Sequence, residues 1–297
     1  MTATLSRDQE AARSVYTVER TRDGDEIRAL LAPHRAYAAY ALAQLEPARF
    51  GLSQWFKATG PEGSALVLHS RGGLGRALFS LGDAEAVDAI LSLHPGPHFS
   101  FGSIQPEHRS VAQTHYIMAR QQVMMRMSVS PDSFSPREGE ALRLRATDTS
   151  DINLLYSAEG GATAYRASDV EDGVYYGVRL DGRLVSIAGT HVVSRQEGAA
   201  VVGNVFTHPR YRGRGLGTIA TSATTADLLQ DCPLVVLTVE ETNAPAVAGY
   251  KRLGYATQCT LHETPLVRKD PLGGFSLARR IIAGWRGRRE GKEVVAR

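Results

Sequence analysis

The chain has 297 residues, 43% of them hydrophobic, and a net charge of +3. This composition is that of a globular protein, and the length suits two domains. No apolar run reaches the roughly 18 residues of a membrane-spanning helix, and the polar N-terminus lacks the apolar core of a signal peptide. Cys232 and Cys259 are too few for a disulfide framework. We therefore expect a cytoplasmic protein without a membrane span.

Basic charge is concentrated near the C-terminal end. Residues 268–297 contain nine Lys and Arg against three Asp and Glu, so the rest of the chain has a net charge of −3. A short helical segment there includes Ile281, Ile282 and Trp285. Nucleic acid, anionic lipid or an acidic partner could bind such a tail. We favour a helix that packs its apolar face on the body, or a solvated end, because one short basic segment provides little electrostatic affinity. No nucleic-acid partner is expected.

The N-terminal half alternates helix-like and strand-like segments. The patterns predict helices over residues 25–45, 84–93 and 106–119, and strands over residues 65–69, 76–81, 99–104 and 123–129. A glycine-rich turn, residues 71–75, joins two of these strands without a helix after it, which favours a hairpin over a phosphate loop. Residues 130–140, with two prolines and a glycine, read as a linker.

The C-terminal half gives a clearer order of elements. Two β-runs separated by Asp181-Gly182 predict a hairpin over residues 173–190. A third strand, residues 199–206, is followed by a helix at 218–229, a strand at 234–239 and a helix at 244–252. The predicted fold is therefore α/β, with a mixed sheet and a ligand loop at the C-terminal end of a strand.

That loop carries the strongest chemical signal of the chain. Gly213, Gly215 and Gly217 let successive backbone N–H groups converge on one anion, and the following helix adds the positive end of its dipole. Arg212 and Arg214 supply positive charge, so we predict a diphosphate site. A mononucleotide P-loop is excluded because no Lys-Ser or Lys-Thr pair follows the glycines. The dinucleotide fingerprint fails because Thr218 stands where its third glycine belongs.

The pattern Arg-x-x-Gly-x-Gly, formed by Arg212, Gly215 and Gly217, is followed in register by Asn243, Ala246, Tyr250, Gly254 and Tyr255. Over residues 175–255 the chain resembles the GNAT superfamily of acyl-CoA-dependent N-acyltransferases. The resemblance implies a mostly antiparallel twisted sheet flanked by helices, with a V-shaped separation between the strands at 199–206 and 234–239. It also implies acetyl-CoA, or another acyl-CoA, as co-substrate.

The N-terminal half looks like a second, degenerate copy of the same fold. It lacks both the arginine–glycine loop and the Asn and Tyr block, which argues against cofactor binding there. The expected organisation is a GNAT-like domain at 1–129, a linker at 130–140, a catalytic GNAT domain at 141–268 and a basic tail at 269–297.

The expected cofactor site follows from the shape of an acyl-CoA. The diphosphate is expected on the amides of residues 213–218, and the pantetheine arm along the backbone of the preceding strand. An N–H near Phe206 would stabilise the tetrahedral oxyanion. The predicted cofactor-binding residues are Val205, Phe206, Thr207, Arg212, Gly213, Arg214, Gly215, Leu216, Gly217, Thr218 and Asn243.

Acyl transfer also requires two proton transfers. The resemblance implies that Tyr250 protonates the departing thiolate, and Asn243 either binds pantetheine or caps the helix that follows. Glu240 is our candidate for the base that deprotonates the amine; Glu159, Glu171 or a chain of waters are alternatives. His208, next to the loop, is not expected to be catalytic.

Other reaction classes lack their signatures. The histidines and cysteines show no metal-ligand spacing, so no metal is expected, and no Gly-x-Ser-x-Gly elbow supports a covalent acyl-enzyme. We expect direct transfer to an amine within a ternary complex. A CoA-binding sensor or scaffold without turnover is the alternative function. A small-molecule acceptor is favoured over a protein, and both monomer and homodimer stay open.

Overall fold

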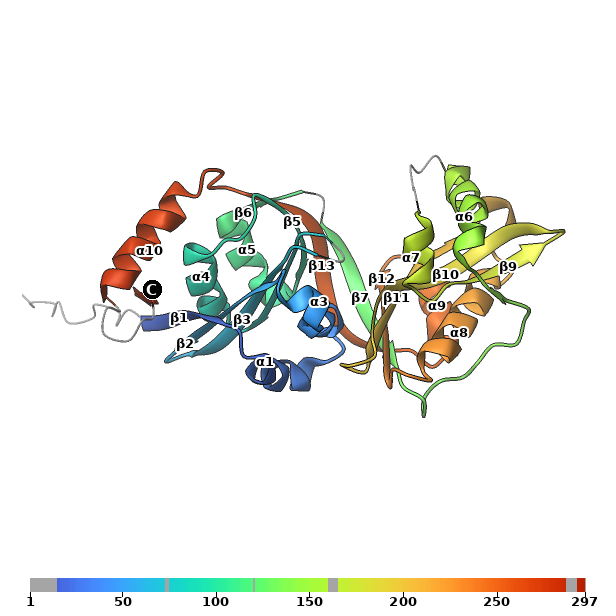
Figure 1. Cartoon of the computed structure of the whole chain (residues 1–297), viewed down its shortest axis with the longest axis horizontal. Helices are drawn as coiled ribbons and strands as arrows, with labels where there is room; N and C mark the ends of the chain where they lie inside the picture. The colour runs from blue at the N-terminus through green and yellow to red at the C-terminus, as the bar shows by residue number, and fades with distance from the viewer. Residues whose placement is uncertain (1–14, 73–74, 120, 160–164, 287–292, 297) are drawn as a thin grey trace, which may run out of the picture.

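The computed structural model describes residues 15–72, 75–119, 121–159, 165–286 and 293–296 (Figure 1). The strands of the N-terminal half are β1 (Val15–Thr21), β2 (Gln54–Gly60), β3 (Gly63–Ser70), β4 (Ala77–Gly82), β5 (Phe99–Ile104) and β6 (Tyr116–Met118). Its helices are α1 (Gly24–Leu31), α2 (Ala39–Leu42), α3 (Pro47–Phe50), α4 (Ala84–Leu93) and α5 (Arg109–His115), with 3₁₀ turns η1 (Ala32–His34), η2 (Ala43–Leu45) and η3 (Pro106–His108).

The C-terminal half repeats this order of elements. Its strands are β8 (Leu142–Arg143), β9 (Tyr176–Leu180), β10 (Arg183–Ser194), β11 (Ala199–Thr207) and β12 (Leu234–Glu240). Its helices are α6 (Thr149–Tyr156), α7 (Ala167–Glu171), α8 (Leu216–Leu228) and α9 (Ala244–Arg252). In each half an antiparallel group of strands leads into a parallel pair joined by a helix, β4 and β5 around α4, and β11 and β12 around α8.

Two strands join the halves into one sheet (Figure 1). They are β7 (Gln122–Val129) and β13 (Ala256–Arg268). β7 comes from the N-terminal half but pairs with β12, and β13 runs from the C-terminal half to lie between β5 and β6. The order β14-β1-β2-β3-β4-β5-β13-β7-β12-β11-β10-β9-β8 is therefore continuous. The expected domain division at 130–140 stays a prediction, and strand pairing crosses it in both directions.

The predicted fold class is confirmed: the sheet is mixed and mostly antiparallel, with helices along it. The hairpin around Asp181-Gly182 is present, with both residues at positive φ, as a tight two-residue turn requires. Two helix predictions were too long. Pro33 interrupts the predicted helix at 25–45, which divides into α1, η1, α2 and η2, and the predicted helix at 106–119 ends at His115. The strands β1, β2 and β13 were not predicted.

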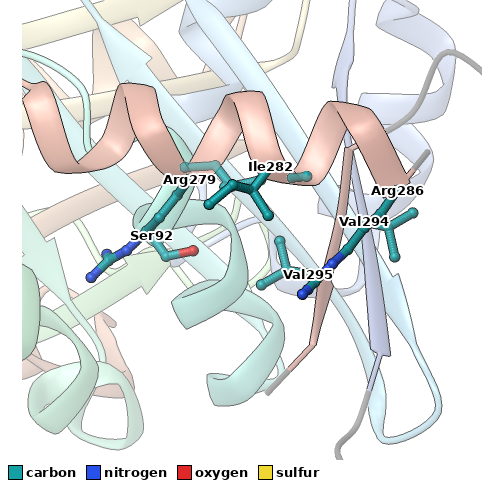
Figure 2. Close-up of a pocket in the computed structure, with 8 residues that line it drawn as sticks. Ser92, Arg279, Ile282, Arg286, Val294 and Val295 are labelled. Carbon is teal, nitrogen blue, oxygen red and sulfur yellow. The ribbon is translucent and has the colours of Figure 1, made fainter. Parts of the chain in front are cut away.

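The tail adds α10 (Gly274–Arg286) and β14 (Glu293–Ala296), which pairs with β1. A pocket of about 240 Å³ lies between them and the end of α4, bordered by Ser92, Arg279, Ile282 and Val295 (Figure 2). Of the two forms expected for this tail, a helix packed by its apolar face or a solvated end, α10 combines parts of both. Its small residues Ser276 and Ala283 are buried, whereas the large apolar ones are exposed: Phe275, Leu277, Ile281, Ile282 and Trp285. None of the described helices is long and apolar enough to cross a membrane.

Candidate active site

The glycine turn leads directly into α8. Gly213 and Gly215 both have left-handed backbones, with φ of 76° and 77°, which only glycine adopts at low cost. Gly215 is the N-cap of α8, so Leu216, Gly217 and Thr218 form the first turn, two residues earlier than predicted. A Cβ at Gly217 would approach Thr207 Oγ1 to 3.1 Å, so the strand end and the helix start are in close contact. The amides of this turn are arranged to bind an anion.

β11 and β12 separate beside this turn. Their parallel pairing ends at Val202 and Leu237, so Gly203–Thr207 has no strand partner on the β12 side. Asn204 has a φ of 53°, and the register between β10 and β11 shifts around it, which marks a bulge that bends β11. The V-shaped separation implied by the family resemblance is therefore present. Val205, Phe206 and Thr207, predicted to bind the pantetheine arm, lie along this open edge.

The arginines of the turn have defined partners. Arg212 pairs with Glu159 at 2.5 Å, donates from Nε to the Thr207 carbonyl at 3.2 Å, and lies 5.8 Å from the ring centroid of Phe206. Arg214 lies over the ring of Tyr211. Glu159, one alternative for the base, is thus engaged at the predicted phosphate site.

Arg137 was missed by the sequence analysis. It lies in the predicted linker, whose backbone is tied to α8 by a 2.8 Å hydrogen bond from the Arg137 N–H to Ser222 Oγ. Its guanidinium is so near the turn that a Cβ built on Gly215 would lie 3.1 Å from Arg137 Nη2. It adds a third positive charge at the predicted diphosphate site. No local sequence signal indicates this contact, because it depends on the path of the linker.

Replacing Glu159 tests the electrostatics of the turn. A bound diphosphate must compete with Glu159 for Arg212, so we expect Glu159→Gln to lower the Kd for CoA about 2- to 5-fold, the range of an exposed ion pair. Isothermal titration calorimetry measures this directly. Glu171→Gln is the matched control, because this exposed glutamate of α7 has no ion pair with the turn. A Kd that is equal in the two variants would contradict the competition.

Tyr250 lies on α9, on the helix-covered side of the separation. Its side chain is 9% exposed and packs in one cluster with Val205 of β11 and Val239 of β12. Burial raises the pKa of its phenol to about 12. Gly249 of α9 lies directly against Thr218 of α8, since a Cβ added to Gly249 would be 2.8 Å from Thr218 Oγ1. Tyr250 therefore lies near both separated strands and the glycine turn.

Asn243 caps α9, since its side chain accepts a 3.3 Å hydrogen bond from the Ala246 N–H. This helix-capping contact was one of the two expected for Asn243, and binding of pantetheine stays a prediction. His208 has a similar local role: its Nδ1 accepts from the Arg210 N–H at 3.2 Å.

Glu240 ends β12 and is partly buried. Side chains alternate along a strand, so Glu240 points to the face opposite Val239 and therefore opposite Tyr250. Segment α2–η2 of the N-terminal half covers this second face, where Ala39 and Ala43 pack with Val201 and Val236. Glu241 is exposed. Within the described ranges, no group of three or more His, Cys, Asp or Glu side chains could hold a metal ion.

Aromatic side chains border Phe206. The ring centroids of Tyr156 and Phe206 are 5.1 Å apart, and Tyr165 stacks on Tyr156 at the same distance. The Tyr156 hydroxyl donates to the Asn204 carbonyl at 2.5 Å, and Tyr175 accepts from Asn204 Nδ2 at 3.2 Å. Tyr156 and Tyr175 thus fix the bulge, and Tyr156 and Tyr165 form an aromatic wall beside the open edge of β11.

The corresponding place in the N-terminal half has no glycine turn. β4 passes directly into α4, whose N-cap is Asp83; this carboxylate accepts from the Ala86 N–H at 3.0 Å. Tyr37 donates to the carbonyls of both Ser80 and Ser103, which links β4 to β5. A negative side chain and an internal bridge thus occupy the region where the C-terminal half has a glycine turn and separated strands. That the N-terminal half does not bind the cofactor stays a prediction.

Comparison with known families agrees with this geometry. Residues 144–255 match the model of the acetyltransferase (GNAT) family. This part of the chain belongs to the GNAT family. The matched range includes the glycine turn, the separated strands and the helix of Tyr250, and the family implies acyl transfer from acyl-CoA.

Relatives extend the likeness beyond the matched range. A mycothiol acetyltransferase from Mycolicibacterium paratuberculosis (strain ATCC BAA-968 / K-10) is 28% identical over 233 residues, which cover 66% of this chain and 71% of the relative. A solved Drosophila protein is 17% identical with a TM-score of 0.61, covering 84% of this chain and 98% of its own. A GCN5-related N-acetyltransferase from Sphaerobacter thermophilus is 16% identical with a TM-score of 0.54, covering 85% and 96%. The fold is therefore shared across both halves.

Proposed function

We propose that the protein is an N-acyltransferase that moves an acetyl or other short acyl group from acyl-CoA directly to an amine. The observation that carries this proposal is the open edge of β11, which meets the glycine turn at the start of α8. A diphosphate on the turn leaves the pantetheine arm free to follow that edge, as an added strand would. The thioester then reaches the point where β11 and β12 separate.

In this proposal the cofactor is held by backbone more than by side chains. The amides from Gly213 to Thr218 bind the diphosphate, and Arg212, Arg214 and Arg137 add charge. A backbone N–H near Phe206 stabilises the oxyanion of the tetrahedral intermediate; one such donor contributes about 2.7–4 kcal/mol. Positioning of the amine against the thioester carbonyl accounts for much of the remaining rate gain.

The two proton transfers are assigned to opposite faces of the sheet. Tyr250 protonates the CoA thiolate from the face that α8 and α9 cover, and its raised pKa keeps the phenol neutral at physiological pH. Glu240 accepts the proton of the amine on the other face.

The acceptor is proposed to be a small molecule. The α2–η2 segment covers the face of Glu240, which restricts access for the surface of a folded protein. The mycobacterial relative is named for acetyl transfer related to mycothiol, and this name supports acetyl as the acyl group.

A pair of glutamate variants tests the proposal. With an accepted amine, Glu240→Gln should lower kcat/KM about 100-fold at pH 7, while the Kd for acetyl-CoA stays within 2-fold. Glu241→Gln, the exposed neighbour, is the control and should keep the wild-type rate. Release of CoA thiol gives the rate, and calorimetry gives the Kd. Equal rates for the two variants would overturn the role of Glu240 and favour a water chain.

The sensor or scaffold alternative has a distinct outcome. If acetyl-CoA binds with a defined stoichiometry but no amine in a broad panel releases CoA thiol, the protein binds the cofactor without turnover. Acyl transfer to any amine at a rate above the uncatalysed reaction rejects that alternative.

A further inference from the structure

A guanidinium is buried without a partner at the centre of the sheet. Arg126 of β7 is 0% exposed, and none of its three guanidinium nitrogens has a hydrogen bond to any residue that the structure describes. The guanidinium lies over the ring of Tyr40, whose centroid is 5.0 Å from Cζ. Thr238, its direct neighbour on β12, also has a buried hydroxyl without a partner in the described chain.

A buried guanidinium without a hydrogen-bond partner destabilises the protein unless an anion binds to it. Arginine stays protonated in proteins, so burial cannot make it neutral as it can a lysine. A buried, unpaired charge has a large desolvation cost, and a planar guanidinium is suited to a bidentate contact with a carboxylate. Arg126 therefore has the chemistry of an anchor for a ligand.

Arg126 faces a cavity of about 280 Å³, here called the central cavity. This volume is at the small end of ligand pockets, which span roughly 300–1,000 Å³. The lining is mostly apolar, with a few polar groups. Its apolar residues are Tyr37, Tyr40, Ala41, Leu68, Ala77, Leu78, Phe79 and Phe101, and its polar residues are Gln44, Ser70, Ser103, Arg126, His191 and Glu263.

The carboxylate already in the cavity does not neutralise Arg126. Glu263 of β13 lines the same cavity, yet no ion pair joins the two side chains among the described residues. In the register of β13 and β7, Arg126 is opposite Cys259, four residues from Glu263 and thus about 13 Å away along the strand. Burial raises the pKa of the Glu263 carboxyl, and the positive charge of Arg126 opposes this effect without a direct contact. The hydrogen-bonding groups of the Arg126 guanidinium are therefore left for a ligand.

The central cavity is lined mostly by the N-terminal half, and two of its lining residues, Arg126 and His191, lie next to the strands that separate. Arg126 lies on β7, opposite Thr238 of β12. Thr238 directly follows Leu237, the last residue of β12 that pairs with β11. His191 of β10 also lines the cavity. Its ring lies against Gly203 of β11, because a Cβ added to Gly203 would be only 2.3 Å from His191 Nε2. Through Arg126 and His191 the cavity approaches the strands along which the thioester is proposed to lie.

Glu240 and Arg126 are also neighbours on the same face of the sheet. Glu240 is opposite Met124 of β7, two residues from Arg126, so the two side chains form a diagonal pair. Cβ atoms in such a pair are about 7–8 Å apart. A carboxylate on Arg126 and an amine near Glu240 can therefore belong to one small molecule.

We infer that the acceptor is an amine that also carries a carboxylate, and that Arg126 binds this carboxylate in the central cavity; the inference rests on the acyl transfer proposed above. The apolar walls then favour an amino-acid-like acceptor with an apolar side chain. Arg126 is a binding residue in this scheme, and Glu240 receives the proton of the amine.

The test compares amines that differ only in the carboxylate. L-phenylalanine is paired with phenethylamine, and L-leucine with isoamylamine, each assayed by CoA release from acetyl-CoA. We expect kcat/KM to be about 100-fold or more higher for the carboxylate-bearing member of a pair. Arg126→Met should abolish this preference by lowering kcat/KM for the carboxylate-bearing member of each pair about 100-fold. Arg195→Met, an exposed arginine paired with Asp231, is the control and should retain the preference.

A second measurement separates a ligand-binding role from a structural one. Without ligand, Arg126→Met should melt at the same or a higher temperature than the wild type, because it removes a buried charge. L-phenylalanine should raise the melting temperature of the wild type and not of the variant. A large fall in the melting temperature of Arg126→Met, with unchanged carboxylate preference in the surviving activity, would overturn the inference.

The remaining outcomes distinguish this inference from the proposed function. Efficient acetyl transfer to plain amines, with no preference for a carboxylate, overturns the inference and leaves the acyltransferase intact. Binding of L-phenylalanine through Arg126 without transfer to any amine overturns the acceptor role and the proposed function together. Transfer that prefers the carboxylate and depends on Arg126 supports both.

Discussion

Gly215→Glu should abolish binding of acetyl-CoA. The new side chain would place a negative charge at the start of α8, where the diphosphate is proposed to bind, and would force a bulky residue into a left-handed conformation with φ of 77°. A Cβ there also meets Arg137 Nη2 at 3.1 Å. We expect the Kd to rise at least about 100-fold, equivalent to roughly 2.7 kcal/mol. Calorimetric titration with acetyl-CoA measures the change.

Gly182→Glu is the matched control for this substitution. Gly182 has nearly the same backbone, with φ of 75°, but lies in the turn between β9 and β10 with open space around its Cα. It should lose a similar amount of stability, about 1 kcal/mol, and bind acetyl-CoA as the wild type does. Equal affinities of the two variants would show that the glycine turn does not hold the diphosphate.

Tyr250→Phe should slow the reaction without weakening the cofactor. Within the described chain the Tyr250 hydroxyl makes no hydrogen bond, so its removal leaves no buried partner unsatisfied. We expect kcat to fall about 100-fold, in the lower range for loss of a general acid, with the Kd for acetyl-CoA unchanged within 2-fold. Single-turnover rates with a good acceptor, together with equilibrium titration, separate the two effects.

Tyr255→Phe is the control for Tyr250→Phe, and we expect it to lower stability without lowering kcat. Its ring centroid is 6.0 Å from that of Tyr250, but its hydroxyl is hydrogen-bonded to Thr225 Oγ1 at 2.7 Å. This variant should lose about 1 kcal/mol of stability and keep its kcat. If both variants lose activity equally, the effect at Tyr250 comes from packing and not from proton donation.

The pH dependence supplies an independent check on Tyr250. Because burial raises its pKa to about 12, the phenol keeps its proton at every pH below about 11. Its deprotonation therefore cannot cause a fall in kcat between pH 8 and about pH 10.5. A descending limb in that range that disappears in Tyr250→Phe would contradict the raised pKa.

The parts of the fold that were predicted correctly depend on local chemistry. Each of these parts is fixed by the backbone conformation of a few neighbouring residues. They are the left-handed pair Asp181-Gly182, the glycine turn and the helix cap Asn243. Their signals are therefore readable in a single segment. The predicted helix bounds failed at Pro33 and after His115, where tertiary pairing and proline outweighed the apolar pattern.

The residues that were missed depend on distant partners. Arg126 occurs in a methionine-rich run that reads as an ordinary strand, and its isolation is visible only when β12, β13 and α2 surround it. Arg137 reads as a linker residue until the linker is laid along α8. In the same way, the long β13 has no regular alternation of buried and exposed residues, because β7 pairs with its first part and β5 and β6 pair with its second part.

The crossing of β7 and β13 has a consequence for biosynthesis. While the chain is being made, the N-terminal half emerges first, but its sheet lacks a strand until residues 256–268 have been translated. At typical rates of about 5–20 residues per second, this delay lasts several seconds or longer. During that time the edge of β5 is exposed and prone to aggregation. We therefore expect nascent chains that stall before β13 to depend on chaperones and to be degraded faster than the finished protein.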